Sequence, residues 1–333
     1  MNRRALGALL ASIALAATAA CGDDGGDSAG SGGDTIKVNF GYIADYNGTS
    51  LLAIADDQGI WDKHGVDVST EVFTNGPLQI TALGAGDLDF GYIGPGAVWL
   101  PASGKAKIVA LNSLGNSDRV IAQAGITSLA QLKGKKVGVP EGTSGDMILT
   151  LALKKAGLSA SDIQRVPMEP ATIVSAFSSG QIDAAGIWYP LLGNIKKRKP
   201  DLVELAKNAD FADEVSFPTE FVAGNDVVSD QKDKVDRVVA ALREAMDWRA
   251  AHGDEAIKLT ADMLHQSPDA VAADAANNQM LTTAELDEYT KNGTIDKWLT
   301  GMGEYFVGAG KLPQQVDPKT YYLGDVFTGA ANK

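Results

Sequence analysis

A glycine-rich turn at residues 141–146, EGTSGD, has the residue types of an anion-binding site. Its two glycines permit a tight backbone turn, and Thr143 and Ser144 offer hydroxyl donors. A helix beginning near Asp146 would point free backbone N–H groups out of its first turn. The turn therefore predicts binding of a sulfonate or carboxylate without any cationic side chain. Plain helix capping by Ser144 or Asp146 is the alternative interpretation, and both can hold together.

Two further segments could form the walls of a binding site. Gly94-Pro95-Gly96 has no bulky side chain, so a ligand could approach its backbone closely, although a simple tight turn is the alternative. Trp188 and Tyr189 end an apolar segment, and their rings could pack against an alkyl chain or face a cation. Trp188 could also be an ordinary core residue.

A weak internal repeat indicates the elements that must position these residues. Residues 80–95 read ITALGAGDLDFGYIGP and residues 174–189 read VSAFSSGQIDAAGIWY, so that Asp89 falls on Asp183. In each copy a helical stretch ends at a glycine and a short apolar strand follows. Chance similarity is the alternative, and it still leaves two αβ units.

The repeat extends outward to a β-loop-α-β-α-β unit in each half of the chain. The first unit begins with a strand at 36–42 and a helix from about Ser50 to Gln58, and the second with a strand at 135–140 and a helix from Asp146 to Ala156. This alternation predicts an α/β fold with mostly parallel sheets flanked by helices, whose ligands bind beyond the carboxyl ends of the strands.

The remaining segments complete a two-lobed organisation. We expect a first lobe formed by residues 35–117 and 223–333 and a second formed by residues 118–222, with hinges near 117–120 and 218–222. A long amphipathic helix is predicted from Lys232 to Ala251, and the rest of the chain should form further helices on the first lobe.

The start of the chain has the pattern of a secretory signal peptide. Arg3 and Arg4 precede an uncharged, apolar run to residue 20, which is followed by Cys21, the only cysteine. Small residues running into a lone cysteine resemble a bacterial lipoprotein cleavage box, which implies a diacylated Cys21. A free thiol is the alternative. Residues 21–34 are rich in Gly, Ser and Asp and should form a flexible spacer.

Composition narrows the function classes. The formal net charge is −13, and loss of Arg3 and Arg4 would make it more negative, which argues against nucleic acid or an acidic membrane as a partner. One cysteine cannot form an internal disulfide. No His, Cys or carboxylate cluster has metal-ligand spacing, so we expect neither a metal nor a cofactor.

Four segments resemble the sulfonate, nitrate and taurine binding proteins of ABC importers, a group that also includes thiamine-precursor binders. They are the GDLDFGYIG segment, KKVGVPEGTSGD, GQIDAAGIWYP and the tail YFVGAGKLPQQVDPKTYYLGDVF. The resemblance implies a two-lobed type II periplasmic binding-protein fold that closes on a small molecule without catalysis. It also implies delivery to an ABC transporter permease.

The same resemblance gives Glu220, in PTEFV, the position of an acid that binds the ammonium group in taurine binders, although aspartate is expected there. An exposed hinge carboxylate is the alternative. Asp45, beside Tyr42 in the first strand-end loop, is a second candidate for this role. With such an acid the ligand would be a zwitterion such as taurine, and without it an alkyl or aryl sulfonate.

The function predicted from the sequence is thus a monomeric, lipid-anchored, extracytoplasmic solute-binding protein. A thiamine-pyrimidine-precursor binder is the alternative. An enzyme that makes such a precursor is less favoured. The enzymes with this activity rely on a cysteine-rich motif and a reactive histidine, whereas this chain has one cysteine, and its three histidines fall in helix or surface contexts without a matching motif. A signalling ectodomain is a further rival.

Overall fold

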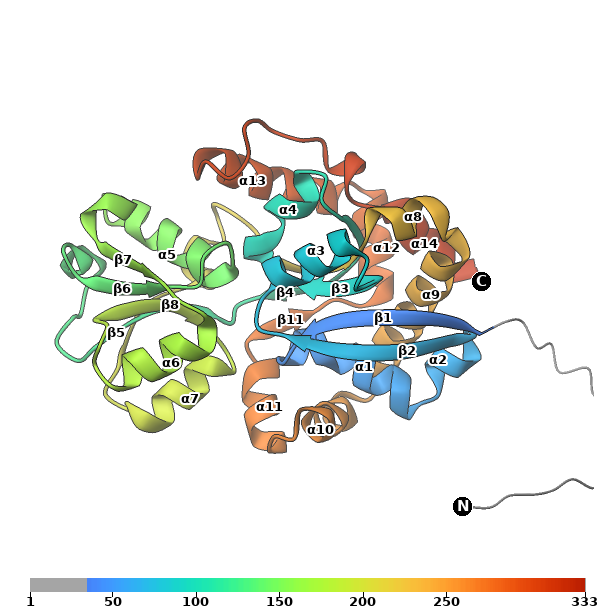
Figure 1. The fold of residues 1–333 in the computed structure, drawn as a ribbon, viewed down its shortest axis with the longest axis horizontal. Helices are drawn as coiled ribbons and strands as arrows, with labels where there is room; N and C mark the ends of the chain where they lie inside the picture. The colour runs from blue at the N-terminus through green and yellow to red at the C-terminus, as the bar shows by residue number, and fades with distance from the viewer. Residues whose placement is uncertain (1–34, 333) are drawn as a thin grey trace, which may run out of the picture. The chain divides into compact units, whose positions relative to one another are not determined.

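The computed structural model describes residues 35–332. The predicted signal peptide, Cys21 and the spacer to residue 34 lie outside the described residues. Within these, two sheets are each flanked by helices, which confirms the predicted α/β class (Figure 1).

The first sheet has the strand order β11-β4-β10-β3-β1-β2. Strand β1 pairs in parallel with β2 and β3, whereas β10 and β11 run antiparallel to their neighbours. The bounds are β1 (Ile36–Ile43), β2 (Val66–Phe73), β3 (Phe90–Ile93), β4 (Lys107–Gly115), β10 (Pro218–Ala223) and β11 (Asn278–Met280).

The second sheet has the order β7-β6-β8-β5-β9, with parallel pairing of β6 to β7 and β8. Helix α5 packs on one face of this sheet and α6 and α7 lie on the other (Figure 1). The bounds are β5 (Asp118–Ala122), β6 (Lys136–Val139), β7 (Gln164–Pro167), β8 (Ala184–Trp188), β9 (Val203–Lys207), α5 (Ser144–Lys155), α6 (Pro170–Ser178) and α7 (Leu191–Arg198).

The internal repeat corresponds to the same strand arrangement in both sheets. The order β2-β1-β3 in the first matches β7-β6-β8 in the second, and an antiparallel strand follows in each. The repeated aspartates have the same role: a carboxylate oxygen of Asp89 accepts from the Asn39 N–H, and one of Asp183 accepts from the Lys136 N–H, both at 2.8 Å. The Asp89 carboxylate thus fixes the start of β3 against β1, and the Asp183 carboxylate fixes the start of β8 against β6.

The first helix begins earlier than predicted. Helix α1 spans Tyr46–Asp57 rather than beginning near Ser50, because Asp45 is its N-cap and accepts from the Gly48 N–H at 2.7 Å. The predicted strand-end loop is therefore shorter, and it brings Asp45 to the end of β1. Helices α2 (Ile60–Lys63), α3 (Gly76–Ala85) and α4 (Trp99–Ala102) complete the first half of this lobe.

The chain crosses between the sheets twice, once between β4 and β5 and once between β9 and β10. Strand β10 lies between β3 and β4, so residues 218–222 belong to the first sheet and not to the second lobe that was predicted for them. The physical reason is that β10 supplies the central antiparallel strand of that sheet.

The C-terminal part of the chain covers the first sheet. Helix α9 spans Lys232–Ala251, which confirms the predicted long helix. Strand β11 was not predicted; it extends the sheet edge along β4. The other bounds are α8 (Asn225–Asp230), α10 (Gly253–Leu264), α11 (Pro268–Ala275), α12 (Thr283–Lys291), α13 (Thr294–Gly308) and α14 (Gly324–Gly329).

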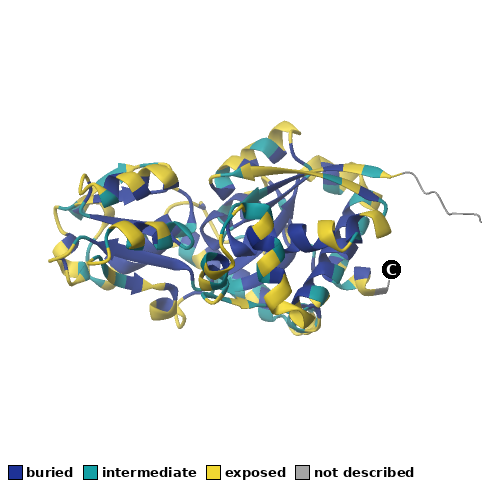
Figure 2. Cartoon of the chain, turned by 90° about the horizontal axis from the view of Figure 1, so that it is seen from below, coloured by how far each residue is buried: buried dark blue, intermediate teal, exposed yellow. Residues whose placement is uncertain are grey.

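The central strands of both sheets are buried between their helices (Figure 2), whereas the edge strand β2 is largely exposed. In the first, the ring of Phe40 packs on Phe90, Phe221 and Trp61, with ring centroids 5.7, 5.8 and 6.4 Å away. Across residues 35–332, none of the helices combines the length and the apolar character needed to span a bilayer.

Candidate ligand-binding cleft

A cavity lies between the two sheets, at the ends of the strands that carry the predicted strand-end loops. By the measure in which one water needs roughly 10–15 Å³, its volume of about 40 Å³ has room for a few waters. It is lined by Ile43, Asp45, Asn47, Asn75, Gly76, Tyr92, Gly94, Pro95, Ala97, Gly115, Ser117, Asp118, Thr143, Ser144, Trp188, Tyr189, Thr219 and Asn278. Both lobes therefore contribute to one small site.

Three helices begin at this cavity, and their first turns differ in capping. Asp45 caps α1, and Asn75 caps α3 by accepting from the Leu78 N–H at 3.1 Å. At α5 the N-cap is Thr143, but its hydroxyl donates to the Pro140 carbonyl at 2.6 Å and makes no capping bond. The first turn of α5 is therefore the one whose N–H groups are not satisfied by its own N-cap side chain.

The loop of the first lobe packs directly on that helix start. Gly94 and Pro95 line the cavity, and Gly96 approaches the Thr143–Ser144 peptide so closely that a Cβ on Gly96 would lie 2.0 Å from the Thr143 carbonyl carbon. Only glycine fits this position. A second contact between the lobes comes from Glu169, which accepts from Thr74 and from Asn75 at 3.0 and 3.3 Å.

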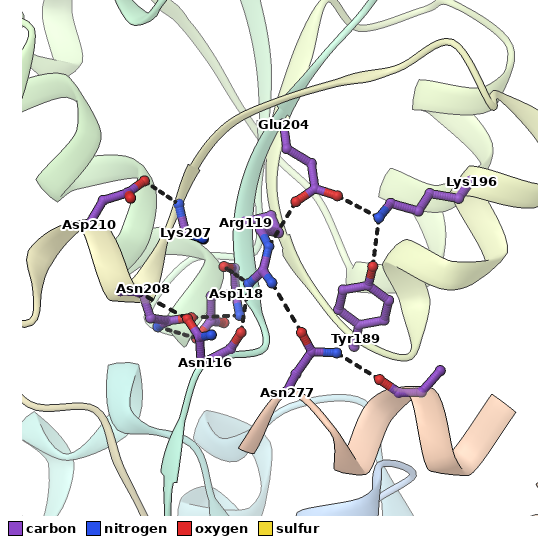
Figure 3. A network of polar contacts seen from close by, with 12 residues as sticks. Asn116, Asp118, Arg119, Tyr189, Lys196, Glu204, Lys207, Asn208, Asp210 and Asn277 are labelled. Carbon is purple, nitrogen blue, oxygen red and sulfur yellow. Dashed lines mark hydrogen bonds and ion pairs between the residues drawn. The ribbon is translucent and has the colours of Figure 1, made fainter. Parts of the chain in front are cut away.

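Aromatic side chains form another part of the wall. Trp188 and Tyr189 stand at the end of β8, and Tyr92 lies on β3. The Tyr189 hydroxyl accepts from Lys196 Nζ at 2.7 Å, and the Arg119 guanidinium lies 5.8 Å from its ring centre (Figure 3). The Tyr189 ring is thus held from its outer side while the cavity remains open to it.

Two carboxylates line the cavity, one from each lobe. Asp118, at the start of β5, is 3% exposed; its backbone N–H donates to Asn208 Oδ1 at 2.8 Å, and its Oδ2 accepts from Asn208 Nδ2 at 2.9 Å (Figure 3). Its Oδ1 has no hydrogen-bond partner. Burial raises the pKa of Asp118; nearby Ser144 acts to lower it, although the two side chains do not meet the geometry of a hydrogen bond in this structure.

Asp45 is the carboxylate of the first lobe. Burial raises its pKa well above the ordinary value, and the charges of Asp274 and Asp118 add to this effect. Asp274 lies beneath it on α11 and accepts from the Tyr46 N–H at 2.7 Å. The carboxylates of Asp274 and Asp118 are therefore both close enough to Asp45 to raise its pKa.

Several residues predicted from the sequence line this cavity together: Asp45, Gly94, Pro95, Thr143, Ser144, Trp188 and Tyr189. Asp146 does not, because its carboxylate accepts from Arg165 at 2.9 Å and from the Gly142 N–H at 2.9 Å behind the turn. Tyr42 does not either; it is half-buried against the core of the first lobe.

Glu220 is the largest departure from the prediction. It is fully buried in β10, neither carboxylate oxygen has a hydrogen-bond partner, and it is absent from the cavity lining. Its neighbour Thr219 lines the cavity instead, because successive side chains of a strand point to opposite faces. The structure therefore does not bring Glu220 to the cavity, and its assignment to an ammonium group stays a prediction without support from this geometry. Burial raises its pKa well above the usual range.

Sequence reasoning missed most of the polar lining. Asn75 could have been found, since an asparagine before Gly-Pro is a helix N-cap signal. Asp118 lies within the hinge predicted near 117–120, which was a weaker signal. The pairing of β11 with β4 brings Asn278 to the site. No local sequence pattern predicts this pairing.

The histidines lie at helix ends away from the cavity. His64 pairs with Glu244, His252 stacks on Trp248, and His265 ends α10 in a left-handed conformation. Among the described residues no three His, Cys or acidic side chains are grouped to hold a metal ion.

The comparisons with known proteins match most of the chain. The model of a family described as "NMT1/THI5 like" matches residues 48–256. A protein of Brucella abortus that is named as a binding protein is 56% identical over 295 residues, covering 89% of this chain and 92% of that protein. A Bacillus subtilis protein, named for binding aliphatic sulfonates, is 29% identical over 274 residues, which is 79% of this chain and 81% of that protein.

A solved structure shares the fold. The alkanesulfonate-binding protein SsuA from Xanthomonas axonopodis pv. citri, bound to MOPS, superposes with a TM-score of 0.70 at 21% identity, over 87% of this chain and 99% of that one. This similarity identifies the two-lobed fold of periplasmic binding proteins.

Proposed function

The chain belongs to the NMT1/THI5-like family, and we propose that it is an extracytoplasmic solute-binding protein that encloses a small organic anion or zwitterion between its lobes. The observation that carries the proposal is the shared cavity, which is lined from both lobes and is too small for a large metabolite. Relatives named for sulfonate binding support the same ligand class.

The anionic end of the ligand is assigned to the start of α5. Its N-cap side chain is turned to Pro140, so the first-turn N–H groups and the Ser144 hydroxyl can serve a sulfonate or carboxylate. The starts of α1 and α3 are less suitable, because Asp45 and Asn75 already satisfy part of them. Taurine and short alkanesulfonates are the probes that fit this assignment.

Delivery to an ABC transporter permease, anchoring through Cys21 and a monomeric state belong to the same proposal. The lobes in it are residues 35–117 with 218–332, and residues 118–217, which differs from the predicted division only around β10. A role as a binding protein rather than an enzyme is favoured by the placement of the three histidines, which stand outside the cavity.

A thermal-shift screen of residues 34–333 tests this function, with taurine, short alkanesulfonates, nitrate, aliphatic amino acids and pyrimidine precursors as ligands. A ligand at about 100 times its dissociation constant should stabilise the fold by roughly 2.7 kcal/mol. We expect a rise in melting temperature with a member of the sulfonate or zwitterion class. A shift with pyrimidine precursors alone would assign the protein to the alternative ligand class.

A further inference from the structure

The charged side chains that line the cavity are all acidic. Asp45 and Asp118 are both acidic, and no lysine, arginine or histidine is among the lining residues of the described chain. Two buried arginines of the structure have hydrogen-bond partners outside the cavity: Arg119 donates to Glu204 and Asn277, and Arg249 donates to Ser50 and Asn112. The charge of Arg119 acts to lower the pKa of Asp118, but Arg119 does not line the cavity, so a purely anionic ligand would meet two carboxylates and no cationic side chain there.

Asp118 lines this space, and one of its carboxylate oxygens, Oδ1, is buried without a hydrogen-bond partner. Asn208 holds both its backbone N–H and its Oδ2, which fixes the carboxylate, while Oδ1 has no partner although the residue is almost completely buried. Leaving a buried carboxylate oxygen unpaired is costly unless a donor arrives. A ligand N–H group would supply that donor.

Asp45 lies close enough that the charge of Asp118 raises its pKa. The two carboxylates belong to different lobes, so a group bound by both would join the lobes. Three aromatic side chains, Tyr92, Trp188 and Tyr189, line the same cavity. Aromatic faces and carboxylates together favour a cationic head group over a neutral one.

We propose that the ligand carries a cationic ammonium group that Asp118 binds together with Asp45, beside an anionic group at the start of α5. This inference rests on the proposed function and narrows its ligand class to zwitterions, because an amine-free sulfonate would leave both carboxylates without a counter-charge. The specificity-determining residues are thus Asp118 and Asp45, in place of Glu220.

The test uses ligand pairs that differ only in the amine. Taurine is compared with isethionate, in which a hydroxyl replaces the amine, β-alanine with 3-hydroxypropanoate, and propylamine with propanol. Isothermal titration of residues 34–333 should show binding of at least one amine-bearing member, at least tenfold tighter than its amine-free partner. Equal binding within a pair, or no binding by any amine-bearing member, overturns the inference.

Two variants locate the effect. Asp118→Asn should weaken the amine-bearing member at least tenfold and remove most of the preference within the pair. Asp45→Asn should act in the same direction, and asparagine still caps α1, so its fold is retained. Asp201→Asn, an exposed position of the second lobe, is the matched control and should leave both affinities unchanged.

The outcomes also separate this inference from the proposed function. If isethionate binds as tightly as taurine and Asp118→Asn changes neither affinity, the ammonium site is excluded while the solute-binding function stands. If both members of every pair fail to bind, the proposed ligand class is excluded together with the inference.

Discussion

Neighbouring side chains decide what each buried acid of this protein can do. Asp118 lines the cavity and has one carboxylate oxygen fixed by Asn208 and the other without a partner, whereas Glu220 has no hydrogen-bond partner and does not line the cavity. Burial raises the pKa of both. Only Asp118 is placed to lower the cost of its charge by binding a ligand.

Glu220→Gln should leave ligand affinity unchanged and alter the pH dependence of stability. Below the ordinary glutamate pKa of 4.5 both the folded and the unfolded state hold the proton. As pH rises above it, the unfolded state ionises first, so the wild type loses stability by up to about 1.4 kcal/mol per pH unit. The variant lacks this loss, and its melting temperature should exceed that of the wild type increasingly from pH 5 to pH 8.

Thermal unfolding across this pH range, with ligand titration at pH 7, checks this prediction. A variant that loses affinity for amine-bearing ligands would return Glu220 to the binding site. A constant difference in melting temperature at all pH values would show that Glu220 is ionised in the folded protein.

Glu220 was assigned from a family resemblance, which does not determine which of two adjacent side chains of a strand faces the cleft. Thr219 and Glu220 are adjacent polar residues of β10, and only Thr219 lines the cavity. The glycine-rich turn was located well because helix-start residue types are local signals. Thr143 and Ser144 line the cavity for this reason, whereas Asp146 turned to Arg165, a partner distant in sequence.

At the scale of the elements, the repeated αβ unit was predictable and the pieces that complete each sheet were less so. The repeat follows from periodicity within short segments, and its two copies have the same strand order. Strand β11 has only the residues Asn278–Met280, and its pairing with β4 depends on the fold of the whole lobe. No local pattern could have predicted it.

Gly96→Ala should weaken ligand binding at least tenfold, about 1.4 kcal/mol, with little effect on the stability of the ligand-free protein. The added Cβ would lie 2.0 Å from the Thr143 carbonyl carbon, so the loop of the first lobe could not rest on the start of α5. Separation of the lobes would relieve the clash without disturbing either core. Isothermal titration and thermal unfolding measure the two effects.

Gly84→Ala in α3 is the matched control, because a Cβ there meets no atom within 4 Å. It should bind ligand as the wild type does. Equal affinity of Gly96→Ala and the wild type would show that ligand binding does not need this contact between the lobes.

At the scale of the whole protein, two crossings join the lobes and side-chain contacts hold them together in this structure. Arg119 donates to Asn277 at 3.0 Å (Figure 3), and Glu169 accepts from Thr74 across the cleft at 3.0 Å. Apolar packing joins the lobes as well, because one hydrophobic cluster includes residues of both. The two crossings are the segments about which a hinge motion can occur.

Small-angle X-ray scattering should therefore record a smaller radius of gyration when a bound ligand is added to the wild type. In the Gly96→Ala variant the decrease should be reduced or absent, because the lobes cannot approach fully. A wild type whose scattering is the same with and without a bound ligand would contradict closure of the lobes. In that case the ligand would enter a preformed cavity.

The order of the strands also has a consequence for how the chain folds. Residues 118–217 form the second sheet without any contribution from later segments, whereas the first sheet needs β10, β11 and the bridge between Ile108 and Tyr322. During synthesis the inserted lobe can therefore finish its core first. The first lobe can complete its sheet only after the segment around Tyr322 has been synthesised. Pairing of this C-terminal segment with Ile108 is therefore expected to be a late step of folding.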